Sequence, residues 1–79
     1  MVVKVIPFAS AKDVLQYEAK EIVLDDNTSV AALMEKFVSE YPILKDKMLL
    51  FAANKEYVGT EYILRDKDEL AIFPPVSGG

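Results

Sequence analysis

The pattern of apolar and polar positions predicts two strands before one long helix. Residues 2–8 are mostly β-branched and apolar and predict a first strand, with Pro7 at its end because proline has no N–H for a sheet ladder. Ser10 is expected to start a short helical turn over 11–15, and a second strand is predicted over 21–24. The two strands are expected to pair as a hairpin whose long connection holds the helical turn.

The long helix follows a polar cluster over residues 25–28. Its apolar side chains recur at helical spacing and form one stripe: Val30, Leu33, Met34, Phe37, Val38 and Tyr41. Thr28 is expected to be the N-cap, because its hydroxyl can accept a hydrogen bond from the first turn. Pro42 disfavours helical geometry in the residue before it, so the helix is predicted to end near Tyr41.

Three further strands are predicted after the helix. The first spans 48–53 and is apolar throughout, so we expect both of its faces to be covered. A short edge strand over 57–58 follows, and a polar turn over 64–69 leads to the last strand, 70–73. Strands on both sides of one main helix predict an α+β fold with a mixed sheet packed on that helix. This order matches a single β-grasp, ubiquitin-like domain over residues 1–79.

Composition restricts the chemistry that the chain itself can perform. The 79 residues include no cysteine and no histidine, which excludes thiolate metal sites and catalysis that needs a histidine base. A net charge of −4 disfavours nucleic acid and anionic lipid, and no apolar run is long enough to span a membrane. We therefore expect a cytoplasmic protein that is not an enzyme by itself and that binds no cofactor, metal, nucleic acid or membrane.

Two groups of acidic residues allow another interpretation. Asp25 and Asp26, and the run of Asp66, Asp68 and Glu69, contain paired carboxylates of the kind used for metal binding or acid–base catalysis. Both groups lie in predicted turns, where aspartate caps helices and bends the chain. A structural role is therefore favoured, and the negative surface would suit a basic protein partner.

The chemistry of the chain is expected at its C-terminus. Residues 73–79 are expected to form a flexible tail, in which Pro74 and Pro75 end the last strand because neither can donate to a sheet ladder. Gly78 and Gly79 have no side chain and fit a channel that any other residue would block. The terminal carboxylate is unreactive until ATP converts it to an acyl-adenylate, which a sulfur donor can turn into a thiocarboxylate. The alternative is an inert flexible end.

The segment 64–79 resembles the C-terminus of the small subunit of molybdopterin synthase, the MoaD family, which ends in the same Pro-Pro and Gly-Gly pairs. Residues 5–9 resemble that family's first strand, and residues 28–33 resemble the start of its main helix. The double proline distinguishes this family from the thiamine sulfur carriers, which share the fold and the Gly-Gly end. Lys67 replaces the glycine of the family's Asp-Gly-Asp turn, so a neighbouring asparagine or aspartate is expected to supply the positive φ.

The resemblance implies a sulfur carrier in molybdenum cofactor biosynthesis. Gly79 matches the residue that an E1-like activating enzyme adenylates with ATP and that a sulfurtransferase converts to a thiocarboxylate, and Gly78 threads with it into the large subunit. That subunit transfers the sulfur to cyclic pyranopterin monophosphate within a heterotetramer, two small subunits on a large-subunit dimer. The implied interface residues are Phe8, Tyr57, Phe73, Pro74, Pro75, Val76 and Ser77.

Other functions stay open at the level of the sequence. The same tail would serve a sulfur carrier for thiamine or tRNA thiolation, or a ubiquitin-like modifier that forms isopeptide bonds with lysines. An interaction domain with an inert tail is a third class. Each of Phe8, Tyr57 and Phe73 is also a candidate core residue, since aromatic side chains are usually well buried.

Overall fold

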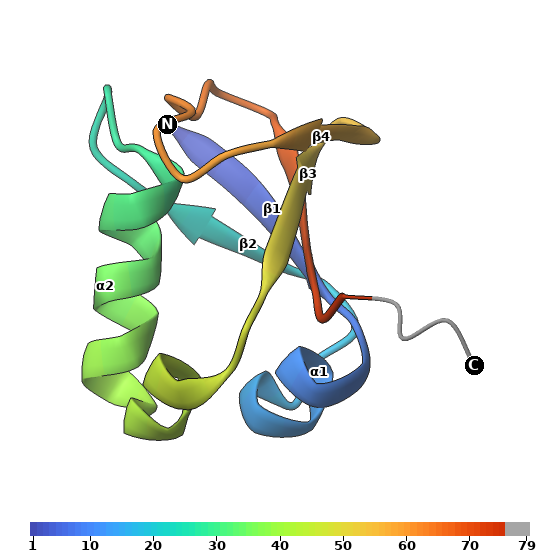
Figure 1. The fold of residues 1–79 in the computed structure, drawn as a ribbon. Helices are drawn as coiled ribbons and strands as arrows, with labels where there is room; N and C mark the ends of the chain where they lie inside the picture. Colours follow the sequence, from blue (N-terminus) through green and yellow to red (C-terminus); the bar gives the residue numbers. More distant parts are fainter. Residues whose placement is uncertain (76–79) are drawn as a thin grey trace.

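The computed structural model describes residues 1–75, which form a five-stranded sheet packed against one long helix (Figure 1). In chain order the elements are β1 (Val2–Pro7), α1 (Ala9–Leu15), β2 (Lys20–Val23), α2 (Val30–Glu40), the 3-10 helix η1 (Pro42–Asp46), β3 (Leu50–Ala53), β4 (Glu56–Val58) and β5 (Glu69–Phe73). The sheet order is β2-β1-β5-β3-β4, with β1 and β5 parallel and the other neighbours antiparallel. This confirms the predicted α+β fold and its mixed sheet.

The core lies between one face of the sheet and α2. The buried side chains alternate along the two central strands, Val3 and Val5 on β1 and Leu70 and Ile72 on β5, because successive strand residues point to opposite faces. They pack with the buried positions of the predicted helical stripe: Val30, Leu33 and Phe37. Within residues 1–75, no helix is both long and apolar enough to cross a membrane.

The first hairpin has the predicted arrangement. β1 and β2 pair in antiparallel register with α1 in their connection, and Pro7 is the last residue of β1. The start of α1 differs from the prediction, because Phe8 occupies the N-cap position and makes no side-chain capping bond. Its carbonyl accepts hydrogen bonds from the amides of Ala11 and Lys12, at 3.1 and 3.4 Å. Ser10 therefore lies inside the helix, and the prediction that it starts the helical turn was wrong.

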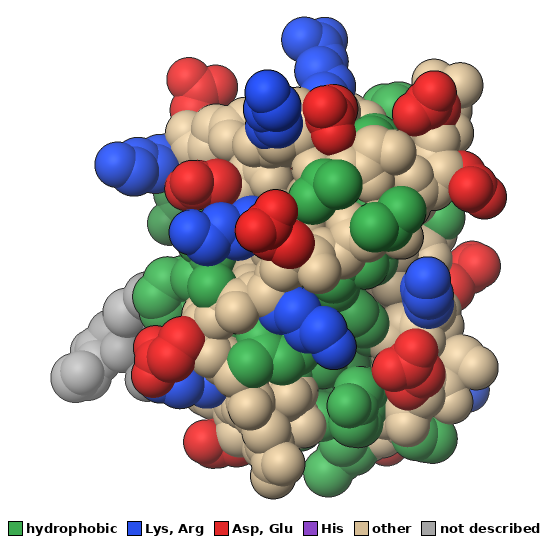
Figure 2. Space-filling model, turned by 180° about the vertical axis from the view of Figure 1, so that it is seen from behind, with side chains coloured by type: hydrophobic (Ala, Val, Ile, Leu, Met, Phe, Trp, Pro, Cys, Tyr) green, Lys and Arg blue, Asp and Glu red, His purple; other side chains and the backbone are tan. Residues whose placement is uncertain are grey.

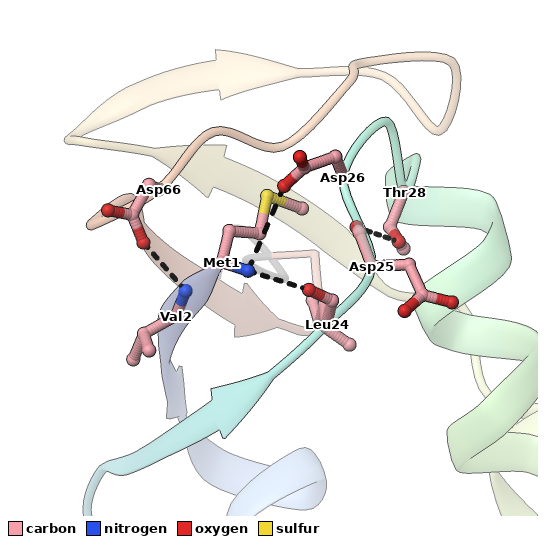
Figure 3. A network of polar contacts seen from close by, with 7 residues as sticks. All are labelled: Met1, Val2, Leu24, Asp25, Asp26, Thr28 and Asp66. Carbon is pink, nitrogen blue, oxygen red and sulfur yellow. Dashed lines mark hydrogen bonds and ion pairs between the residues drawn. The ribbon is translucent and has the colours of Figure 1, made fainter.

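The cap of α2 is one residue later than predicted. Ser29 takes the N-cap position, and its hydroxyl oxygen accepts a hydrogen bond from the amide of Ala32 at 3.1 Å. The hydroxyl of Thr28 instead donates to the carbonyl oxygen of Asp25 at 2.6 Å, which closes the preceding turn (Figure 3). The helix ends at Glu40, close to the predicted end at Tyr41, and Pro42 begins η1, which was not predicted.

β3 corrects the expectation of a strand covered on both faces. It begins at Leu50 rather than at Met48, whose side chain is 74% exposed. Phe51 and Ala53 point into the core, whereas Leu50 is exposed on the other face. The helices α1 and α2 do not cover that second face in the described part of the chain, so the apolar side chains there contact solvent.

The turn before β5 is held by the start of β1. Asp66 accepts a hydrogen bond from the amide of Val2 at 2.7 Å, while the Met1 nitrogen donates to the Leu24 carbonyl at 2.8 Å (Figure 3). Lys67 has a φ of 71° and donates its amide to the carbonyl oxygen of Val2 at 2.7 Å. Lys67 thus adopts the positive φ itself, and the prediction that a neighbouring asparagine or aspartate would do so was wrong.

Candidate functional site

The face of the sheet opposite α2 carries a continuous set of apolar side chains. The register places Leu50 opposite Phe73, and Ala52 lies opposite both Tyr57 on β4 and Ala71 on β5. Ile6 on β1 lies opposite Ala71 on the other side. We call this set the apolar face: Ile6, Leu50, Ala52, Tyr57, Ala71 and Phe73.

Two predicted interface residues meet on the apolar face. The ring of Tyr57 contacts the ring of Phe73 edge to face, with 5.8 Å between the ring centroids and 61° between the ring planes. Tyr57 is 78% exposed, and Phe73 is half-buried. Neither belongs to the buried core, so their alternative interpretation as core residues was wrong.

Phe8 is held next to the end of β5 by its main chain. Its amide donates a hydrogen bond to the carbonyl oxygen of Ile72 at 2.9 Å, and its side chain is 49% exposed. Phe8 is therefore also outside the core. Its hydrogen bond to Ile72 places its main chain beside the residue that precedes Phe73. The strand β5 ends beside α1, where the chain leaves the sheet (Figure 1).

The predicted tail begins where the apolar face ends. Pro74 and Pro75 follow Phe73 directly, and Pro75 is exposed. Val76, Ser77, Gly78 and Gly79 lie outside the described residues, so the residue expected to carry the acyl group stays a prediction from the sequence.

Exposed hydrophobic side chains also occur elsewhere. Figure 2 shows the molecule from behind, where lysine and acidic side chains alternate with hydrophobic ones. Exposed large side chains outside the apolar face include Val23, Ile43, Met48 and Ile63. What distinguishes the apolar face is that it includes the last residue of β5, from which Pro74 continues.

Asp68 is a structural residue whose buried role the sequence did not reveal. Its side chain is 6% exposed, and its carboxylate accepts hydrogen bonds from the Asn54 amide group at 2.9 Å, the Tyr62 hydroxyl at 3.0 Å and the Arg65 main-chain amide at 2.9 Å. Burial raises the pKa of the Asp68 carboxyl, but these hydrogen bonds favour the charged form and the net effect lowers that pKa. The carboxylate therefore ties the β3–β4 turn and the 59–65 loop to the start of β5.

Three of the acidic side chains that were considered for metal binding or catalysis have structural partners: Asp26, Asp66 and Asp68. The carboxylate of Asp66 accepts from the amide of Val2, that of Asp68 has the three donors described above, and that of Asp26 lies 3.8 Å from the N-terminal amine of Met1. Asp25 contributes its main-chain carbonyl, which accepts from Thr28. In the described part of the chain, no three residues of the metal-binding types come close enough to hold an ion.

Comparison with known proteins identifies relatives over the whole chain. A family model described as the ThiS family matches residues 5–79. The molybdopterin synthase sulfur carrier subunit of Escherichia coli (strain K12) is 36% identical over 81 residues, which covers 98% of this chain and 99% of that protein. These findings confirm the resemblance that the tail motif indicates.

Solved structures confirm the ubiquitin-like fold. A molybdopterin converting factor subunit 1 from Pyrococcus furiosus matches with a TM-score of 0.84 and 27% identity, covering 95% of this chain and 98% of that one. Ubiquitin from Caldiarchaeum subterraneum matches in fold with a TM-score of 0.65 at 15% identity, covering 100% and 98%. Subunit 1 of the Helicobacter pylori factor, solved in a complex with subunit 2, matches in fold with a TM-score of 0.66 at 24% identity, covering 100% of both chains.

Proposed function

The chain belongs to the ThiS family, and from this premise we propose that it is the sulfur-carrier small subunit of molybdopterin synthase in molybdenum cofactor biosynthesis. Relatives that match over almost their full length carry that name, which supports the proposal. Its proposed site of action is the cytoplasm, where ATP is available to an activating enzyme.

The proposed chemistry takes place at the C-terminal carboxylate of Gly79. An E1-like enzyme joins the carboxylate to the α-phosphate of ATP and releases pyrophosphate, which makes the acyl carbon reactive. A sulfurtransferase then supplies sulfur at the oxidation level of sulfide, which displaces AMP from the acyl carbon, so the acyl-adenylate becomes a thiocarboxylate. In the large subunit's active site the sulfur passes to cyclic pyranopterin monophosphate, and water restores the carboxylate of Gly79. The small subunit contributes no catalytic side chain to these steps, and ATP is bound by the activating enzyme.

The single observation that carries the proposal is the continuity between the apolar face and the tail. Phe73 belongs to both, because it is the last residue of β5 and its ring packs against Tyr57. A large subunit that covers the apolar face would receive Pro74 and the residues after it at the edge of the same interface. Burial of an exposed apolar surface favours association, so docking and delivery of the tail are coupled.

Intact-mass spectrometry of the protein, co-expressed with its activating enzyme and sulfurtransferase, tests the proposed chemistry. We expect the mass to increase by the difference between one sulfur and one oxygen, and we expect the modified C-terminal peptide to contain Gly79. A variant that lacks Gly79 is the matched control and should stay unmodified. Adducts on lysines of other proteins would instead indicate a ubiquitin-like modifier, and an unchanged mass would indicate an inert tail.

A second measurement separates the sulfur pathways. The thiocarboxylated protein is mixed with the large subunit of molybdopterin synthase and cyclic pyranopterin monophosphate, and molybdopterin formation is measured. We expect product in proportion to the thiocarboxylate supplied. If no molybdopterin formed and the sulfur were instead transferred to a thiamine precursor or to tRNA, the protein would be a carrier for thiamine synthesis or for tRNA thiolation.

A further inference from the structure

β4 is a three-residue strand at one edge of the sheet, and β3 is the only strand that pairs with it in the sheet order. Its central residue, Tyr57, is 78% exposed, so packing into the core does not fix the position of this side chain. A two-stranded hairpin is only marginally stable in water by itself. The contact between Tyr57 and Phe73 therefore depends on contacts that hold the β3–β4 hairpin to the rest of the fold.

The turn between β3 and β4 consists of two residues with a positive φ, Asn54 at 53° and Lys55 at 72°. Positive φ at both central positions is characteristic of a type I′ hairpin turn, which asparagine adopts more readily than lysine does. The main-chain amide of Asn54 donates to the carbonyl oxygen of Glu69 at 2.8 Å, one residue beyond the paired positions Ala53 and Leu70. The turn therefore lies beside the first residue of β5.

The side chain of Asn54 continues the hydrogen bonding that the turn interrupts. Its Oδ1 accepts a hydrogen bond from the amide of Glu69 at 3.0 Å, which is the bond that a main-chain oxygen would accept in a continuing antiparallel pair. Its Nδ2 donates to Oδ1 of Asp68 at 2.9 Å. Asn54 is exposed, so these bonds fix the turn without a contribution from the core.

The chain after β4 returns to the same carboxylate. The hydroxyl of Tyr62 donates to Oδ2 of Asp68 at 3.0 Å. The main-chain oxygens of Thr60 and Tyr62 accept hydrogen bonds from the amides of Ala31 and Val30 at the start of α2, at 2.8 and 2.9 Å. β4 is therefore anchored at both of its ends, and the anchor before it depends on one exposed side chain.

We propose that Asn54 is a positioning residue for docking to the large subunit. This role rests on the proposed function, because Asn54 acts through Tyr57 on the apolar face. The Asn54 side chain fixes the β3–β4 turn, and the turn fixes β4, which holds the Tyr57 ring against Phe73 before the large subunit binds. The apparent affinity of a protein falls with the fraction of molecules that have the binding arrangement, so a preformed contact strengthens docking.

A pair of glycine variants in the same turn tests the proposal. Asn54→Gly keeps a residue that adopts positive φ and removes both side-chain hydrogen bonds. Lys55→Gly is the matched control, because Lys55 is the other turn residue, also has a positive φ and is exposed. We expect Asn54→Gly to bind the purified large subunit about three- to tenfold more weakly, measured by isothermal titration calorimetry. Lys55→Gly should bind as the wild type does.

A spectroscopic readout in the free protein separates positioning from a general loss of stability. The NMR shifts of the Tyr57 ring protons depend on the nearby Phe73 ring, and Phe73→Ala gives their values without that contact. In Asn54→Gly we expect these shifts to move towards the Phe73→Ala values. Phe37→Leu should lose stability, because Phe37 is buried on α2, but should keep the ring shifts and the affinity of the wild type.

If Asn54→Gly does not fold, the double variant Asn54→Gly/Lys55→Gly is compared with Lys55→Gly by the same two measurements, since glycine adopts positive φ without strain. Weaker binding together with displaced ring shifts supports the proposal. Either change without the other, or neither change, would overturn the role of Asn54 while leaving the proposed function intact. A wild-type protein that does not bind the large subunit would instead overturn the proposed function, and the role of Asn54 with it.

Discussion

Tyr57 and Phe73 lie on two strands that are not neighbours, yet their rings meet edge to face at 5.8 Å between centroids. β3 runs between them and carries Ala52, which is opposite Tyr57 on one side and Ala71 on the other. Because alanine has so small a side chain, the tyrosine ring can reach across β3 to the last residue of β5. The apolar face is therefore built around the point where the tail leaves the sheet.

Phe73→Ala should weaken binding to the large subunit by about 1 to 4 kcal/mol, as expected for an aromatic anchor of an interface. Isothermal titration calorimetry with the purified large subunit measures this change. Val23→Ala is the matched control, because Val23 is 75% exposed but lies on β2, at the far edge of the sheet. An unchanged affinity for Phe73→Ala, with a clear loss of thermal stability in the free protein, would show that Phe73 serves the core instead.

The contact between the two rings should itself be measurable. A double-mutant cycle with Tyr57→Ala, Phe73→Ala and the double variant, followed by urea unfolding, is expected to give a coupling energy of about 0.5 to 1.5 kcal/mol. Edge-to-face aromatic pairs interact favourably beyond the area that they bury, which is the reason for the expected sign. Strictly additive effects would mean that the two rings do not support each other in solution.

The elements that the sequence predicts well are those with a local signal. The helix α2 can be recognised from the spacing of its apolar residues alone, because those from Val30 to Phe37 recur with the period of a helix. The central strands can be recognised in the same way, because their apolar residues alternate with the period of a strand. The cap of α2 was misplaced by one residue because Thr28 and Ser29 are adjacent and both are capping types, with serine the more favourable. In the structure Ser29 caps the helix, and Thr28 closes the preceding turn.

Two other errors arise from contacts that no local pattern contains. An apolar run such as 48–53 looks the same whether its second face is covered by its own chain or exposed for a partner, so the exposure of Leu50 was missed. The buried role of Asp68 depends on Asn54, 14 residues earlier in the chain, and on Tyr62, six residues earlier, and neither contact follows from a helix or strand period. Of the candidate site, the sequence predicted that Tyr57 and Phe73 belong to one interface but could not predict that their rings touch.

Deletion of Gly79 should abolish formation of the thiocarboxylate while leaving the thermal midpoint within about 1 °C of the wild type, since surface changes away from the core have small effects. Within residues 1–75 the buried core side chains all lie between Val3 and Ile72, which is the reason for the small effect that we expect on stability. Intact-mass spectrometry and a thermal melt of the same sample measure both quantities. Addition of one residue after Gly79 is a second variant and should have the same effect on sulfur transfer. Loss of folding in either variant would show that the end of the chain is structural.

Asp68 should make the stability of the fold depend on pH in acid. Its pKa in the folded protein is below the ordinary value for an aspartate, because the donors from Asn54, Arg65 and Tyr62 favour the carboxylate. A carboxyl with a lowered folded pKa stabilises the native state above the ordinary pKa of about 3.9, and this contribution is lost as the pH falls through the lower, folded value. The free energy of unfolding should therefore decrease below about pH 4.

Asp68→Asn isolates this contribution, because the amide is nearly the same size but cannot accept all three hydrogen bonds. At pH 7 the variant should lose about 1 to 3 kcal/mol of unfolding free energy, as expected when buried donors lose a charged acceptor. The difference from the wild type should shrink in acid, where the wild-type carboxyl becomes protonated. Urea unfolding at pH 7 and in acid measures both values, with the exposed Asp13→Asn on α1 as the control. A difference that stays constant over this range would mean that the charge of Asp68 does not hold the turn before β5.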